Sequence, residues 1–228
     1  MPSAIARALL GHGSGGMMRA MKLTSHSLRD GQPIPEKNAM GVRGEAGPVP
    51  GPNLSPHLAW SDVPEGTRSF ALLAVDVDAP SPEKANRSDV TIPDSAPRSD
   101  FYHWILVDIP ASTRELAEGL DSQGLTPKGK PPGKTSYGVR GVNSYKEWFG
   151  DDAEMGGDYG GYDGPWPPFN DERTHRYHFT LYALDVDSLK LPEPIRGSDV
   201  VNAIKGHVLA EARLTVTHSL APDGRRAG

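Results

Sequence analysis

Apolar segments alternate along this chain with segments rich in glycine and proline. Residues 69–77 are apolar on both faces for most of their length, as in a strand at the centre of a packed sheet. Residues 101–109 and 175–186 are rich in aromatic and β-branched residues and predict two more central strands. The alternating pattern of residues 212–217 and of residues 21–28 predicts a final and a first strand.

Two segments carry helical signals, and two others read as loops. Residues 113–120 predict a short helix, and residues 198–210 a longer one, because apolar residues recur there at every fourth position. Residues 81–99 are polar and predict a long surface loop. Residues 121–172 hold many glycines and prolines, but their aromatic content is typical of a segment that packs against the fold rather than of disorder.

This pattern predicts an antiparallel β-sandwich of two packed sheets with a few short peripheral helices. We expect residues 1–20 to be an N-terminal lead, helical or disordered, residues 21–220 one domain, and residues 221–228 a disordered tail. The apolar run at residues 4–10 is short and is interrupted by Arg7, so it does not read as an export signal, and we expect a cytoplasmic protein.

Composition narrows the classes of partner. The chain of 228 residues has a net charge of −5, and its lysines and arginines are scattered, which argues against nucleic acid as a partner. Cysteine is absent, so the sequence has no disulfide and no thiolate metal site. No apolar run reaches the length of about 18 residues that a membrane-spanning helix requires.

Polar and ionisable residues lie at the ends of the three central strands. Asp76 and Asp78 are two positions apart and share a face, as do His175 and Tyr177, while His103 lies inside another strand. Each position taken alone fits a structural role at least as well as a functional one. Together, on converging strands, they predict a pocket with donors for an anion and acceptors for an amine or hydroxyl. We also expect the carboxylates to favour charged histidines.

Several motifs, in the same order, resemble those of the phosphatidylethanolamine-binding protein family. They are Asn53-Leu54-Ser55-Pro56 with Leu58 and Trp60, Asp76-Val77-Asp78-Ala79-Pro80, Tyr102-His103-Trp104, Pro167-Pro168 and His175-Arg176-Tyr177. The resemblance covers roughly residues 21–218. It implies that Arg176 faces away from a ligand pocket, and that the ligand is a phosphatidylethanolamine-type head group. The pocket residues that it implies are Asp76, Asp78, His103, Pro167, Pro168, His175 and Tyr177.

The sequence departs from the family pattern at Val77, where proline is usual, and in two longer segments, residues 83–99 and 145–163. We expect binding of a small anionic or phosphorylated ligand without turnover, cofactor or metal. One alternative is a metal-dependent or acid/base hydrolase that uses the Asp/His cluster, although the sequence has no His-x-x-x-His pair and no Gly-x-Ser-x-Gly motif. Another is a kinase or protease inhibitor that acts through residues 121–172. Residues 145–163 could also join a homodimer, although a packed surface loop is the simpler interpretation.

Overall fold

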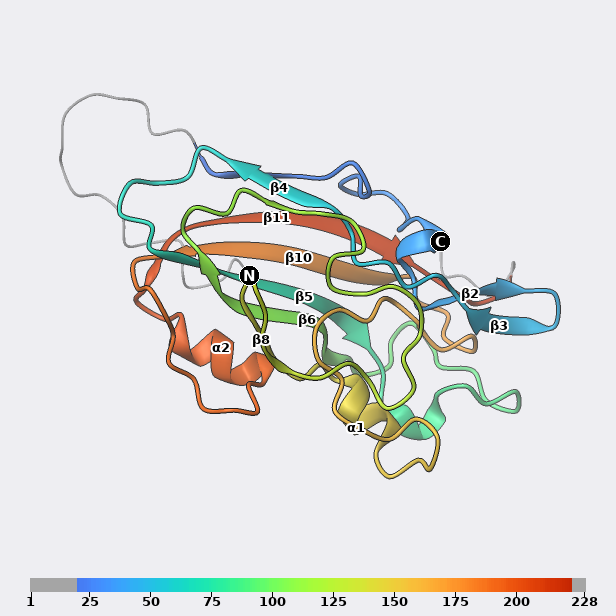
Figure 1. Cartoon of the computed structure of the whole chain (residues 1–228). Coiled ribbons are helices and arrows are strands. Elements are labelled where there is room, and N and C mark those ends of the chain that lie inside the picture. Colours follow the sequence, from blue (N-terminus) through green and yellow to red (C-terminus); the bar gives the residue numbers. More distant parts are fainter. Residues whose placement is uncertain (1–19, 223–228) are drawn as a thin grey trace.

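The computed structural model describes residues 20–222, and a six-stranded antiparallel sheet forms its centre (Figure 1). The strands follow the order β11-β10-β5-β6-β9-β8 across this sheet. Their bounds are β5 Ser69–Ala79, β6 Ser99–Pro110, β8 Gly133–Lys134, β9 Val139–Arg140, β10 His175–Leu184 and β11 Val208–His218. The three central strands predicted from the sequence are therefore confirmed as β5, β6 and β10, which are neighbours in the sheet.

A smaller sheet of three strands, in the order β1-β4-β7, lies on one face of the large sheet, and helix α2 lies on the other (Figure 1). Strands β2 and β3 form a separate hairpin. The bounds are β1 Lys22–Thr24, β2 Gly41–Gly44, β3 Gly47–Pro50, β4 Leu58–Ser61, β7 Glu115–Leu116, α1 Tyr145–Phe149 and α2 Gly197–Ala203. Short 3-10 turns occur at Glu36–Asn38 and Pro82–Lys84. The predicted antiparallel sandwich is confirmed.

The apolar pattern of β5 follows from burial on both faces. Phe70, Leu72 and Ala74 belong to the core between the two sheets. Ala71 and Leu73 point to the opposite face and belong to a second core. That second core includes the α2 residue Val200 and the following residue Ile204. Successive side chains of a strand point to opposite faces, so a strand covered on both sides needs apolar residues at almost every position.

Both helix predictions need correction. Residues 113–120 contain no helix: Glu115 and Leu116 form β7 and pair with Ala59 and Leu58 of β4, so burial of Leu116 in the core outweighs the local helical preference. The second helix covers Gly197–Ala203 and does not extend to residue 210. Gly206 has a φ of 83°, in the left-handed region, and the chain then enters β11 at Val208.

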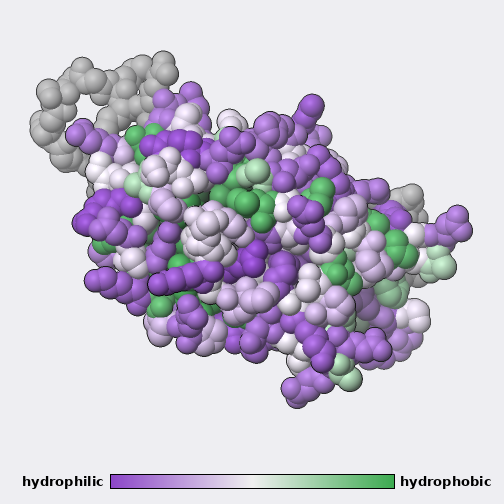
Figure 2. Space-filling model, viewed as in Figure 1, coloured by the Kyte–Doolittle hydropathy of each residue, from purple (hydrophilic) through white to green (hydrophobic). Residues whose placement is uncertain are grey.

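The aromatic-rich segment at residues 121–172 packs against the fold, as predicted. Tyr145, Tyr159 and Tyr162 are all buried, with exposed fractions of 3%, 0% and 0%. Residues 81–99 form a largely exposed loop, also as predicted. The face in Figure 2 is mostly hydrophilic, with apolar residues in separate small groups.

Of the predicted lead and tail, residues 1–19 and 223–228 lie outside the described part of the chain. Across residues 20–222, no helix has the length and apolar character needed to cross a bilayer.

Candidate functional site

A small pocket lies where β5 ends and where β6 and β10 begin, beside the loop that precedes β10. Its volume is about 20 Å³, which is room for about one or two water molecules. The lining residues are Asp76, Ala79, Pro80, Phe101, His103, Tyr145, Trp148, Trp166, Pro167, Pro168, His175 and Tyr177. The structure thus gathers six of the seven site residues predicted from the sequence around one cavity and leaves Asp78 outside its lining.

The strand register explains why residues far apart in sequence meet here. Strand β5 lies between β10 and β6, and Asp76 is the cross-strand partner of Tyr177 on one side and of Phe101 on the other. His103 is two positions beyond Phe101 on the same face of β6, and its ring contacts the Tyr177 ring edge to face at 5.3 Å between centroids. The convergence predicted for three separate strands is therefore present.

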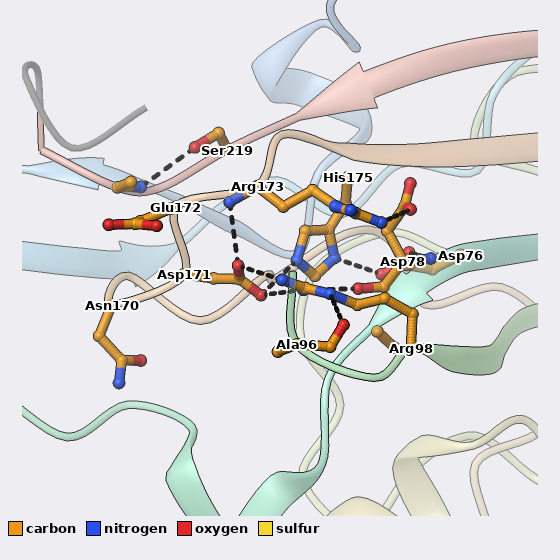
Figure 3. Close-up of polar contacts among 12 residues, drawn as sticks. Asp76, Asp78, Ala96, Arg98, Asn170, Asp171, Glu172, Arg173, His175 and Ser219 are labelled. Carbon is orange, nitrogen blue, oxygen red and sulfur yellow. Dashed lines mark hydrogen bonds and ion pairs between the residues drawn. The ribbon is translucent and has the colours of Figure 1, made fainter. Parts of the chain in front are cut away.

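His175 is held between two carboxylates (Figure 3). Its Nδ1 lies 2.7 Å from Oδ2 of Asp76, and its Nε2 lies 3.0 Å from Oδ2 of Asp171. Carboxylates only accept hydrogen bonds, so both ring nitrogens carry protons and the imidazole is positively charged. Burial lowers the pKa of His175, but the hydrogen bonds and charges of Asp171 and Asp76 outweigh it and raise this pKa to about 9.

Asp171 is a site residue that the sequence did not reveal. It is 1% exposed, and Arg98, whose side chain is 8% exposed, pairs with its carboxylate through both terminal nitrogens. Burial raises the pKa of Asp171, and the hydrogen bonds from His175 and Arg98 more than offset this, so the pKa falls below its usual value. Asp171 lies in a loop four residues before His175, so no strand periodicity marks it.

His103 has the opposite protonation state. Its Nδ1 lies 2.8 Å from the backbone carbonyl of Asp163, so Nδ1–H donates, and Nε2 has no hydrogen-bond partner among the described residues. Burial lowers the pKa of His103, and the charge of Asp76 offsets this only in part. His103 is therefore neutral at pH 7, with a free lone pair on Nε2. The expectation of charged histidines is confirmed for His175 and is wrong for His103, because only His175 touches carboxylates.

The loop that orients His103 is itself fixed by a buried polar cluster. The Asp163 carboxylate accepts hydrogen bonds from the Asn53 amide at 3.0 Å, the Lys130 ammonium at 2.8 Å and the Asn143 amide at 2.9 Å. Asp163 is 1% exposed. These bonds hold the Asp163 carbonyl against His103, and so they determine which ring nitrogen of His103 carries the proton.

Asp78 anchors arginines. Its carboxylate accepts hydrogen bonds from the Arg176 backbone N–H at 3.0 Å, from Nε and Nη2 of Arg176 at 2.8 and 2.9 Å, and from Arg173 at 3.1 Å. Burial raises the pKa of Asp78, but the bonds from Arg176 and Arg173 outweigh it and lower the pKa to about 2. The β5–β6 register shifts between Asp76 and Ala79, so the two aspartates do not share one environment as regular pleating predicted.

Tyr177 has a buried hydroxyl without a partner. The residue is 1% exposed, and its oxygen makes no hydrogen bond of normal geometry with any described group, although the Asp76 carboxylate lies close enough to interact with it. Burial, and then the charge of Asp76, raise the pKa of Tyr177 well above its usual value, so the hydroxyl keeps its proton. A buried hydroxyl without a partner costs free energy, and here it belongs to a residue that lines the pocket, where a water or a ligand can complete it.

A larger cavity adjoins the pocket. Its volume is about 290 Å³, and its walls are mainly aromatic and aliphatic. They are formed by Met40, Pro48, Asn86, Tyr145, Trp148, Phe149, Trp166 and Phe169. Tyr145, Trp148 and Trp166 line both spaces, so the polar pocket opens beside an apolar one.

One group of residues outside the pocket has the composition of a metal site. His26, His57 and Glu115 have potential ligand atoms within 4.8 Å of one another. However, Nδ1 of His57 accepts the backbone N–H of His26 at 3.1 Å, so its proton is on Nε2, 3.1 Å from Glu115. Neither nitrogen of His57 then has a free lone pair for a metal, and the arrangement is a local hydrogen-bonded cluster of the small sheet.

The chain is similar in sequence to known proteins over most of its length. The sequence profile described as phosphatidylethanolamine-binding protein matches residues 24–219. UPF0098 protein YbhB of Escherichia coli is 35% identical over 204 residues, which cover 87% of this chain and 100% of that protein. A UPF0098 protein of Aquifex aeolicus is 33% identical, with 85% of each chain covered.

Solved structures agree with the sequence matches. The crystal structure of Escherichia coli YbcL, described as a new member of the mammalian PEBP family, matches with a TM-score of 0.63 and 25% identity, over 88% of this chain and 99% of YbcL. The homologue CT736 of Chlamydia trachomatis matches with a TM-score of 0.59 and 29% identity, over 88% of this chain and 97% of its own. This chain belongs to the phosphatidylethanolamine-binding protein family.

Proposed function

We propose that this protein binds a small anionic ligand with an apolar body, without turning it over. The observation that carries the proposal is that the two cavities are adjacent and share Tyr145, Trp148 and Trp166 in their linings. The polar pocket is too small for more than the end of a polar group, whereas the second cavity is in the range of small-ligand sites. The family description supports a phosphate-bearing head group as the polar part.

The residues around the pocket support binding rather than catalysis. Among the described residues, no serine, threonine, cysteine or lysine lines it, which leaves Asp76, His103 and Tyr177 as the lining side chains that could attack a substrate. Both nitrogens of His175 are engaged with carboxylates, which leaves this imidazole no lone pair to act as a base, so the Nε2 atom of His103 is the one imidazole nitrogen of the described pocket lining that could accept a proton. Asp76, His103, His175 and Tyr177 are accordingly proposed as ligand-binding residues, with Pro167 and Pro168 as walls.

Calorimetric titration with phenyl phosphate and with inorganic phosphate tests the proposal. Phenyl phosphate is expected to bind about tenfold or more tightly, because its ring buries apolar surface in the aromatic cavity. Phe169→Ala, at a residue that lines only the aromatic cavity, is expected to remove most of this advantage and to leave inorganic phosphate binding unchanged. Val201→Ala, a substitution of an exposed residue of α2, is the control.

Failure to bind phenyl phosphate would refute the proposal. Release of phenol during incubation with stoichiometric protein would instead favour the hydrolase.

The cytoplasmic location and the homodimer expected from the sequence remain proposals. Light scattering of the purified full-length chain measures its mass directly. Twice the chain mass of 24.5 kDa would support the homodimer, and the chain mass itself would contradict it.

A further inference from the structure

We call the part of the pocket formed by Asp76, His103, His175 and Tyr177 its inner end. The hydrogen-bonding groups that remain free there are mostly acceptors. Both N–H groups of His175 are already donated to Asp76 and Asp171, and the N–H of His103 is donated to the Asp163 carbonyl. Pro80, Pro167 and Pro168, which form part of the wall, have no backbone N–H. A fully deprotonated anion would therefore find few of the donors that anions require.

Three groups remain for a ligand at this end. The Asp76 carboxylate and the free Nε2 of His103 are acceptors, and the unpartnered Tyr177 hydroxyl is a donor. Trp148 and Trp166, which are partly exposed and line both cavities, add indole N–H donors at the boundary between the two spaces. The inner end thus matches a group that donates one hydrogen bond and accepts another.

The negative charge of Asp76 also favours a ligand group that carries a proton. Asp76 is 4% exposed, and an oxyanion without a proton would be placed beside its carboxylate in a poorly solvated space. The positive charge of His175 offsets this repulsion only in part, and both of its N–H groups are directed at carboxylate oxygens, so neither is left for the ligand. A proton on the ligand lowers its charge from about −2 to −1, which reduces the repulsion, and supplies the missing donor.

We propose that the inner end of the pocket selects the singly protonated form of a phosphate monoester over a phosphodiester. This inference rests on the proposed function and specifies its ligand class. The P–OH group donates to Asp76 or to Nε2 of His103, and a phosphoryl oxygen accepts from the Tyr177 hydroxyl. A phosphodiester at neutral pH has no P–OH and cannot make the first contact.

The titratable groups around the inner end set the pH dependence. They are Asp76 of β5, His103 of β6, His175 and Tyr177 of β10, Tyr145 of α1, and Asp163 and Asp171 of the adjoining loops. His175 stays charged from pH 5.5 to 8, because its pKa is about 9, and His103 is neutral from pH 6.5 upward, because its pKa is below the usual value, so the change between pH 6.5 and 7.5 reports on the ligand. The second ionisation of the ligand, with a pKa of about 6, therefore dominates.

Calorimetry of the full chain with three probes at pH 5.5, 6.5 and 7.5 tests this selection. The probes are phenyl phosphate, methyl phenyl phosphate and benzylamine, which share an aromatic ring and differ in the polar group. At pH 5.5 phenyl phosphate is expected to bind about 10- to 100-fold more tightly than its methyl ester. Its affinity is expected to fall about tenfold between pH 6.5 and 7.5, as the monoanion loses its proton.

Equal binding of the methyl ester, with no pH dependence, would overturn the selection and leave the anion pocket intact. Tighter binding of benzylamine would overturn it in favour of an ammonium group. Binding of none of the three would refute the proposed function itself. The wild-type series thus separates the two proposals without any substitution.

Asp76→Asn adds a second test, because an amide offers donors where the carboxylate offers only acceptors. The preference for the monoester over the diester is expected to shrink to about threefold or less. Asp187→Asn, which alters an ion pair with Arg68 at an exposed site, is expected to keep the wild-type preference. An unchanged preference in folded Asp76→Asn protein would contradict the role given to Asp76.

Discussion

The two buried histidines of the pocket differ in every respect that governs their chemistry. His175 has a carboxylate on each nitrogen and is charged, with a pKa of about 9. His103 has a carbonyl on one nitrogen and nothing on the other among the described residues, and burial lowers its pKa. Their strands both flank β5 and their rings line the same cavity. The partner atoms, rather than depth of burial, decide which imidazole is charged.

This difference divides the pocket into a saturated side and an open side. On the saturated side, Asp76, His175, Asp171 and Arg98 satisfy one another and form a rigid, nearly neutral chain of charges. On the open side, His103 and Tyr177 keep hydrogen-bonding capacity unused. We infer that the saturated side maintains the shape of the pocket and that the open side recognises the ligand, together with the acceptor capacity that Asp76 still has at the boundary between the two sides.

A substitution that removes one charge from the saturated side should lower the unfolding free energy more than any substitution on the open side. Asp171→Ala leaves Arg98 and charged His175 buried with unpaired N–H groups, which costs about 3–5 kcal/mol of unfolding free energy. Urea unfolding followed by tryptophan fluorescence measures this loss. Asp89→Ala, at an exposed ion pair with Arg87, is the matched control and should leave the midpoint unchanged. A similar small effect for both variants would remove the distinction between the two sides.

The pH dependence of stability should follow from His175. Its folded pKa of about 9 lies above the unfolded value of 6.5, so the stabilisation is complete below pH 6.5 and is lost as the pH rises to about 9. A difference of this size corresponds to about 3 kcal/mol. Unfolding free energies at pH 6.5, 7.5 and 9 should decrease accordingly, and Asp171→Asn should flatten the slope. A constant or rising stability over this range would show that His175 is not charged.

The contribution of His103 to the pH dependence of the unfolding free energy should have the opposite sign and should fall in a lower pH range. Its folded pKa lies below the unfolded value, so its contribution is present above pH 6.5 and is lost as the pH falls below that value.

Sequence reasoning located the strands and the pocket but not the pairing inside it. The alternating and apolar runs predicted β5, β6 and β10, and the polar residues at their ends predicted the cavity, because strand periodicity is a local property of the chain. Asp171 and Asp163 were missed because they lie in irregular loops, where no period indicates the direction of a side chain. The surroundings of Asp78 depend on a register shift near the end of β5, which a regular pleat does not predict.

Removing the unpartnered hydroxyl should have a small effect on stability and a clear one on binding. Tyr177→Phe loses no hydrogen bond within the described fold, so unfolding free energy should change by less than about 0.5 kcal/mol. Phenyl phosphate should bind about tenfold more weakly at pH 5.5, because one donor to a charged ligand is lost.

Tyr145→Phe is the matched comparison in the same cavity. The Tyr145 hydroxyl donates to the Gly164 carbonyl at 2.8 Å, so its removal should cost about 1–2 kcal/mol of unfolding free energy. The reverse pattern, a stability loss in Tyr177→Phe and unchanged binding, would assign Tyr177 to the scaffold.

The two histidine states can be observed directly by ¹⁵N NMR titration of the imidazoles, with and without phenyl phosphate. We predict that His175 has protons on both nitrogens at pH 7.5 and loses one only near pH 9, whereas His103 is neutral with its proton on Nδ1. Phenyl phosphate should shift the Nε2 signal of His103 and leave the His175 signals nearly unchanged. Titration of both rings near the ordinary value of about 6.5, with no response of His103 to the probe, would contradict the account.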